Sequence, residues 1–307
     1  GITFFLWSAG GIPFFSENVD DARMSYARSA YAATLATTLD VSAVFCAAFL
    51  LFARGGDSSK RFFCLFVVIL FVVVAILSGS RSRLMKLVVP FFVIYSISYK
   101  KINVFYLLFF GIFGLFFIGA IGFYRAYSLW GEGVWPGLNQ EGVYDVVDAV
   151  IYYATIELRT AVYGLSIVVD RIPEYTKHTY GILQISPLIM PLPFNTPTPG
   201  MFFKDMIGGT WHGAGLAATF ISPMYADFGV FGVVFSCFVI SLFMSVVYSR
   251  AVSGGYDAIY YSILYAILFF FLLAGIRSDF VSFEFIWFLS VAIAIIFFRV
   301  GGVRVFK

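Results

Sequence analysis

Arginine is the residue type that most clearly marks a chemical site in this chain. Two arginines end a turn of small residues between Ser78 and Arg83, and others lie near the ends of separate apolar segments. The guanidinium group stays charged and presents a planar fork of donors that fits phosphate oxygens. The alternatives are lipid-headgroup binding by a short loop and local charge balance. We expect a cationic diphosphate site formed by Arg81, Arg83, Arg159 and Arg277.

Three side chains are candidates for moving a proton at that site. His212 lies in the glycine-rich stretch Gly208–Gly215, where backbone and ligand can approach closely, and histidine is the usual proton shuttle near neutral pH. Asp227 lies in an apolar run, and an intramembrane carboxylate is a functional candidate by default. Glu157 lies two residues before Arg159. For each, a structural ion pair or packing role is the alternative.

Aromatic residues beside these candidates suit a sugar ligand. We expect sugar contacts from Trp211, next to His212, and from Tyr225, two residues before Asp227. The sequence has no HExxH, Cys/His or Asp-rich pattern of the kind that marks a metal site. We therefore expect no metal and no cofactor, with arginine neutralising the ligand's charge.

Composition predicts the elements that position these residues. Of the 307 residues, 61% are hydrophobic and 12% charged, whereas soluble domains carry about 25% charged residues. Lipid must therefore surround much of the chain, which leaves helices or closed barrels. Apolar runs such as 62–77 are continuous rather than alternating, which favours helices. We predict an all-α, polytopic transmembrane bundle. The net charge of +3 does not suggest a nucleic-acid partner.

The apolar runs divide the chain into three parts. We expect N-terminal transmembrane helices in residues 1–123, a large loop in 124–215 and C-terminal transmembrane helices in 216–307, with seven or eight spans in all. The chain opens inside an apolar run without a basic start, so we interpret it as a fragment that lacks N-terminal helices.

Basic residues in short loops predict the orientation. Arg54, Lys60, Lys100 and Arg250 fall in loops of one side, which the positive-inside rule assigns to the cytoplasm. The large loop then lies on the periplasmic side. Lys86, just inside a span, is expected to snorkel to that outer surface.

The large loop itself has three predicted features. Apolar residues at helical spacing in 144–169 indicate an amphipathic helix that lies at the membrane interface or caps the bundle. The proline-rich stretch from Pro187 to Pro199 is expected not to form a helix. Pro223, at the start of the next span, is expected to bend that helix around a cavity.

Two motifs and the topology resemble a known family. LSGSRSR at 77–83, the large late loop, and GGTWHGAG followed by SPMYADFGVFG at 208–232 resemble the Wzy-type O-antigen and oligosaccharide repeat-unit polymerases. The stretch from Tyr225 to Gly229 is the most characteristic. This chain is short for that family, which missing N-terminal helices would explain.

The resemblance implies a metal-independent glycosyltransferase of the integral-membrane GT-C type in the bacterial inner membrane. It would join undecaprenyl-diphosphate-linked repeat units at the periplasmic face, with membrane lipids and a chain-length regulator protein as further partners. By position, Arg81, Arg83, Arg159 and Arg277 would hold the diphosphate, and His212 or Asp227 would be the base.

Two other functions remain open. O-antigen ligases use similar lipid donors with a lipid A–core acceptor. A transporter of lipid-linked sugars or polysaccharides would need charges deep in several spans and symmetry between its halves. Deep charges are few here, essentially Asp40 and Asp227, which favours a reaction at one membrane surface.

Overall fold

The computed structural model describes residues 30–52, 58–77, 81–98, 103–189, 198–209, 215–216, 218–253, 258–277, 285–286, 288–290 and 293–294. Within these ranges the regular elements are α-helices and a short 3-10 helix, and no strand occurs. This confirms the prediction of an all-helical protein.

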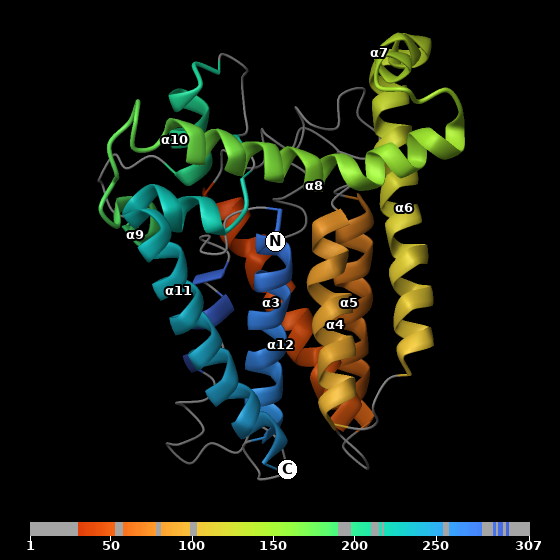
Figure 1. The fold of residues 1–307 in the computed structure, drawn as a ribbon. Helices are drawn as coiled ribbons and strands as arrows, with labels where there is room; N and C mark the ends of the chain where they lie inside the picture. Colours follow the sequence, from red (N-terminus) through yellow and green to blue (C-terminus); the bar gives the residue numbers. More distant parts are fainter. Residues whose placement is uncertain are drawn as a thin grey trace.

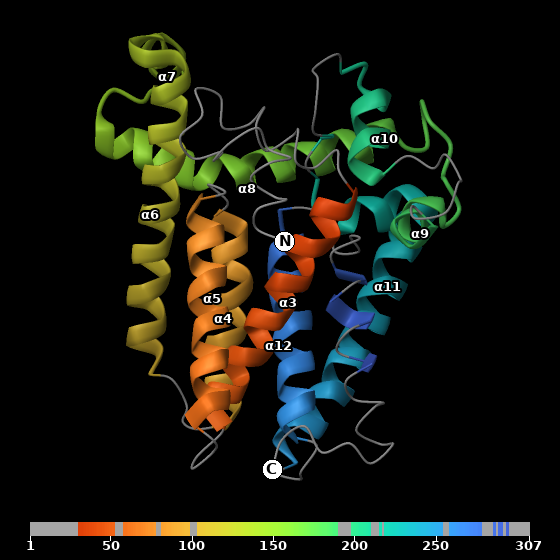
Figure 2. The ribbon, with the colours of Figure 1, turned by 180° about the vertical axis from the view of Figure 1, so that it is seen from behind.

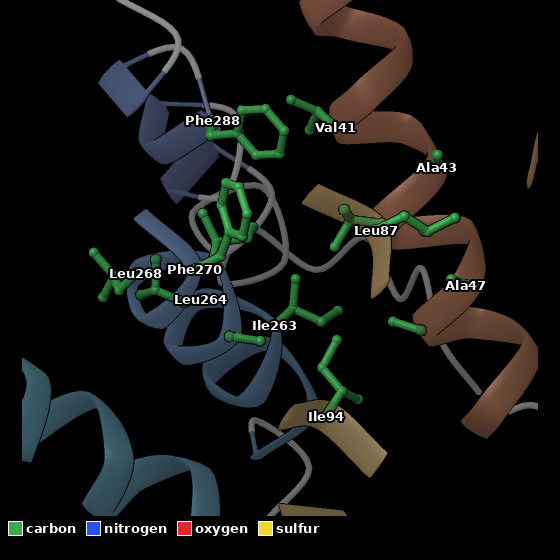
Figure 3. Packing of buried hydrophobic residues seen from close by; sticks show 14 of the residues in the cluster. Val41, Ala43, Ala47, Leu87, Ile94, Ile263, Leu264, Leu268, Phe270 and Phe288 are labelled. Atoms are coloured by element: carbon green, nitrogen blue, oxygen red, sulfur yellow. The ribbon is translucent and has the colours of Figure 1, made fainter. Parts of the chain in front are cut away.

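Lengthwise helices form the body of the molecule (Figure 1). They are α3 (Ala30–Phe52), α4 (Ser58–Leu77), α5 (Arg81–Ser98), α6 (Val104–Trp130), α11 (Ile221–Val252) and α12 (Ala258–Gly275). Side chains of α3, α4, α5 and α12 form the main hydrophobic core, to which Val41, Ile94, Ile263 and Phe288 contribute (Figure 3). Helix α6 packs mainly against α8 rather than against this core.

Among the described residues, α4, α11 and α12 are long and apolar enough to cross a membrane. Shorter apolar stretches occur in α3, α6 and α8, and α5 begins with three basic residues, Arg81, Arg83 and Lys86. Two of the apolar runs that make up this predicted total are 2–15 and 280–298. The first lies wholly outside the described residues, and so does most of the second. The total of seven or eight spans therefore stays a prediction.

Helix α8 (Val146–Arg171) corresponds to the predicted amphipathic helix and lies across one end of the lengthwise helices (Figures 1 and 2). Its first turn is capped by Asp145, whose side chain accepts a hydrogen bond from the amide of Asp148 at 2.7 Å. The 3-10 helix η2 (Gly131–Gly133) and α7 (Val134–Gln140) connect it to α6.

The crossing of α6 and α8 depends on a glycine. A Cβ atom at Gly119 would overlap the carbonyl oxygen of Val150 in α8. The two helices can therefore pack this closely only because the position has no side chain.

Prolines behave differently from the sequence prediction at both ends of the 187–199 stretch. Pro187 lies inside α9 (Ile182–Ile189), and Pro199 is the first residue of α10 (Pro199–Met206). The hydroxyl of Ser186 donates to the carbonyl of Leu183 at 3.1 Å, the acceptor that an amide at position 187 would have used. A first helical residue such as Pro199 needs no amide partner. Residues 190–197 lie outside the described residues.

The bend in α11 lies five residues after the predicted position. Pro223 is the third residue of the helix, where its missing amide removes no intrahelical bond. The helix breaks instead at Phe228 and Gly229, and Gly229 has φ +64° and ψ −152°. Only glycine adopts that conformation readily. In Figure 1 the segment before the break lies beside α9 and the segment after it runs down the bundle.

The close crossing gives a first prediction. Gly119→Ala should destabilise the fold by about 1–3 kcal/mol, because the added methyl group forces α6 away from α8. The measurement is the thermal unfolding midpoint of the purified protein in detergent. Gly111→Ala, in the same helix but with open space around it, is the matched control and should unfold as the wild type does. Equal midpoints for the two variants would contradict the crossing.

Candidate functional site

The arginine-bearing segments meet at one end of the bundle. Arg81 begins α5, Arg159 lies in the middle of α8, and Arg277 follows the last turn of α12. The amide of Phe220 donates to the carbonyl of Gly275 at 2.7 Å, which joins the start of α11 to the end of α12. Figures 1 and 2 place α8 across this same end.

Two of the predicted diphosphate ligands have described side chains that reach the surface. Arg159 is exposed, and its guanidinium lies 5.6 Å from the ring centroid of Tyr152, a cation–π arrangement that holds it along α8. Arg277 is exposed in the turn after α12. The side chain of Arg81 lies outside the described part of the chain.

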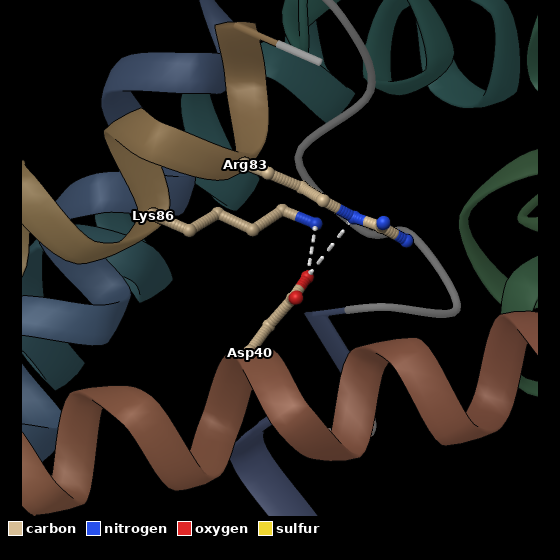
Figure 4. Close-up of polar contacts among 3 residues, drawn as sticks. All are labelled: Asp40, Arg83 and Lys86. Atoms are coloured by element: carbon tan, nitrogen blue, oxygen red, sulfur yellow. Dashed lines mark hydrogen bonds and ion pairs between the residues drawn. The ribbon is translucent and has the colours of Figure 1, made fainter. Parts of the chain in front are cut away.

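Arg83 has a different environment. Its Nε lies 3.8 Å from Oδ2 of Asp40 in α3, and Nζ of Lys86 lies 3.2 Å from the same oxygen (Figure 4). All three residues are at least nine-tenths buried. The predicted snorkelling of Lys86 is therefore wrong: the amine turns inward, because an unpaired Asp40 carboxylate inside the bundle would be costly.

Asp227 is fully buried and accepts three hydrogen bonds. The donors are the hydroxyl of Thr179 at 2.5 Å and the amides of Leu183 and Gln184 at 3.2 and 3.0 Å. Both amides belong to the first turn of α9, where backbone donors lack helical partners and a carboxylate is favourable. Asp227 therefore caps α9 from another helix rather than pairing with an arginine.

The segment between α8 and α9 is bound to the break in α11. The amides of Thr179 and Tyr180 donate to the carbonyls of Ala226 and Asp227 at 3.1 and 3.2 Å. These carbonyls lie at the break, where helical donors are missing. We call residues 178–184 the strap. The strap accounts for two residues of the stretch 225–229. The carboxylate of Asp227 accepts hydrogen bonds from the strap, and Gly229 forms the break that leaves the carbonyls for it.

Tyr225, a predicted sugar contact, is part of the same arrangement. Its hydroxyl donates to the carbonyl of Ile172 at 3.4 Å, just after α8 ends. Its ring packs edge-on against His178, with centroids 6.5 Å apart. The tyrosine therefore supports the strap, and its sugar contact stays a prediction.

His178 is the residue that the sequence reasoning missed. Its Nδ1 lies 3.1 Å from the carbonyl oxygen of Ala226, and because a carbonyl can only accept, Nδ1 is the donor. No hydrogen bond to Nε2 occurs among the described residues. The one feature of the sequence that could have singled out His178 is that the chain has two histidines in all.

The remaining candidates are not described at side-chain level. Glu157 lies in α8 by its backbone, whereas His212 and Trp211 lie outside the described residues. In the described part of the chain, no group of three His, Cys, Asp or Glu side chains is placed to hold a metal ion.

Comparison with known families decides the class of protein. The sequence profile of O-antigen polymerases matches residues 2–289, nearly the whole chain. The chain belongs to the O-antigen polymerase family. This confirms the resemblance found in the two motifs. The family implies a polymerising, glycosyltransferase-like activity on lipid-linked oligosaccharides in a membrane, consistent with the long apolar helices. No curated protein and no solved structure gives a significant match.

The cap on α9 gives a prediction for this O-antigen polymerase. Asp227→Asn should cost about 1–3 kcal/mol of stability, since an amide cannot accept all three hydrogen bonds and leaves a buried donor without a partner. Hydrogen exchange at Leu183 and Gln184 should become faster than in the wild type.

The control is Asp170→Asn, which removes an exposed carboxylate near the end of α8. It should leave the exchange of the strap unchanged. Unaltered exchange in Asp227→Asn would show that the carboxylate does not hold α9.

Proposed function

We propose that this O-antigen polymerase joins undecaprenyl-diphosphate-linked oligosaccharide repeat units at the periplasmic face of the bacterial inner membrane, without a metal. The observation that supports the proposal is that the start of α5, helix α8 and the end of α12 lie at one end of the bundle, and these segments carry or precede Arg81, Arg159 and Arg277. The opposite end carries Lys60 and Arg61 at the start of α4 and Arg250 near the end of α11, as expected for a cytoplasmic side.

The reaction follows from the chemistry of a sugar diphosphate. A hydroxyl of the incoming unit attacks the anomeric carbon of the growing chain, and the bond from that carbon to the diphosphate oxygen breaks. The electron pair leaves with the lipid diphosphate. Arg81, Arg159 and Arg277 would stabilise this charge, and preorganised donors of this kind can contribute about 3–4 kcal/mol each. Trp211 and Tyr225 would contact the sugars.

Arg83 has a supporting role in this proposal. Its contact with Asp40 ties α5 to α3 directly below Arg81, so it fixes the start of α5 rather than reaching the ligand. The diphosphate contacts are therefore assigned to the other three arginines.

A base would accept the proton of the attacking hydroxyl and contribute roughly 10²–10⁴-fold. His212 and Glu157 stay candidates. Asp227 is the weakest, because its carboxylate already accepts hydrogen bonds from α9 and Thr179. We add His178, whose Nδ1 donates to the carbonyl of Ala226 and whose Cε1 and Nε2 lie beside Gly229 at the break in α11.

The alternatives use the same lipid donor. A ligase-like transferase would differ only in its acceptor. A transporter would need charged groups inside the bundle, and the contact between Asp40 and Lys86 is one such pair. Both residues are buried, however, and their contact joins α3 to α5, which is a packing role. A chain-length regulator protein is a further proposed partner, which would act on the product rather than on the chemistry.

The arginine proposal predicts the effect of single substitutions. Arg159→Ala and Arg277→Ala should each reduce polymerisation by about 10²-fold, because charge on the leaving diphosphate loses a donor. Polymer ladders from cells with matched protein levels give the measurement. Arg159→Lys should restore only part of the activity, since lysine lacks the bidentate fork.

Arg250→Ala is the matched control, an exposed arginine at the opposite end of α11. It should give wild-type ladders. Wild-type ladders from both Arg159→Ala and Arg277→Ala would remove the diphosphate site.

The base proposal is tested by two variants of one residue. His178→Asn keeps a donor near the position of Nδ1, and so the contact with Ala226, but removes the lone pair at Nε2. If His178 is the base, turnover should fall by roughly 10²-fold or more with KM for the acceptor little changed. His178→Gln removes the donor to Ala226 and should also lower stability. Full turnover in His178→Asn would restrict the residue to a structural role.

A further inference from the structure

Helix α8 has two apolar sides, of which one packs against other helices in the described part of the chain. Ala149, Val150, Ala161 and Val168 are buried. They place one side of the helix against α6 near its start and against α11 near its end. The inward side thus accounts for the position of α8 across the bundle.

The second apolar side is exposed. Val147, Ile151, Leu158, Val162 and Val169 follow one another at intervals of four or seven residues, which places them on one line along a helix. Each is between 45% and 62% exposed. We call these five residues the apolar stripe of α8.

A polar stripe runs directly beside the apolar stripe. Asp148, Arg159 and Asp170 each come directly after a member of the apolar stripe, about 100° further around the helix, and all are exposed. A helix with an apolar line and a charged line side by side is typical of the membrane–water boundary, where one side meets hydrocarbon and the other meets headgroups and water.

The apolar stripe continues onto α6. The two helices cross at Gly119 and Val150, between Val147 and Ile151 of the stripe. Below this crossing, α6 exposes large apolar side chains over more than half of its circumference, among them Phe105, Leu108, Phe113, Leu115 and Phe117. A protein partner covers one side of a helix, whereas lipid surrounds it, so this exposure indicates lipid around α6.

We propose that the apolar stripe of α8 binds the acyl chains of bilayer lipids at the membrane–water boundary. The helix then lies half immersed, parallel to the membrane plane, with its polar stripe among the headgroups. This orientation places Arg159 at the level of the lipid phosphates. The inference rests on burial and spacing alone and holds whichever reaction the protein catalyses.

The test compares one position in each stripe. Cys46, Cys64 and Cys237 are replaced by alanine, and a nitroxide spin label is attached to Val162→Cys or to Asp170→Cys. The protein is reconstituted in nanodiscs of phosphatidylethanolamine and phosphatidylglycerol. Collision of each label with oxygen, which partitions into lipid, is compared with its collision with a water-soluble nickel chelate.

We expect the ratio of oxygen to nickel collisions to be higher at Val162 than at Asp170 and to approach that of a label at Phe113 in α6. A label at Ile151 should agree with Val162, which guards against a local effect of one substitution. Equal nickel access at Val162 and Asp170 would place both stripes in water and overturn the proposal. Exclusion of both reagents from Val162 would also overturn it, since a protein partner or a second copy would then cover the stripe.

Discussion

The buried carboxylate of Asp227 is the constraint on which this end of the molecule depends. In an apolar environment its charge must be matched by donors, and Thr179, Leu183 and Gln184 supply them from outside α11. The break at Gly229 leaves the carbonyls of Ala226 and Asp227 for the strap. One charge thereby joins α11 to α9, and the strap ties the segment that follows α8 to the break in α11.

The same rule accounts for the other deep carboxylate, with a different outcome. Asp40 has side-chain cations as partners, and Lys86 and Arg83 turn inward to reach it. This contact ties α3 to α5 and sets the start of α5, where Arg81 lies. Both carboxylates act within the scaffold, so the proposed chemistry depends on arginines that the scaffold holds at its end.

Local patterns predicted much of this arrangement. Continuous apolar runs gave the lengthwise helices, and helical spacing gave α8 within two residues of its bounds. Two features depended on distant partners and could not be predicted. They are the inward turn of Lys86, whose partner is 46 residues away, and the cap by Asp227 on residues 43–48 positions away. The helix at Pro187 instead depends on a local substitute, the hydroxyl of Ser186, which donates to the carbonyl of Leu183. The sequence predicts the bend at Pro223, because proline is a common cause of helix kinks. The bend lies instead at Gly229, whose positive φ interrupts the helix.

The central claim is that this family member forms polymer from lipid-linked repeat units with its own residues at one membrane surface. The most direct measurement is incubation of the purified, reconstituted protein with an undecaprenyl-diphosphate-linked repeat unit in the presence of a chelator, followed by gel separation of the products. The account predicts a ladder of products that differ by one repeat unit, formed equally well with and without chelator. Unchanged substrate in a preparation shown to be folded, or a ladder that the chelator abolishes, would contradict it.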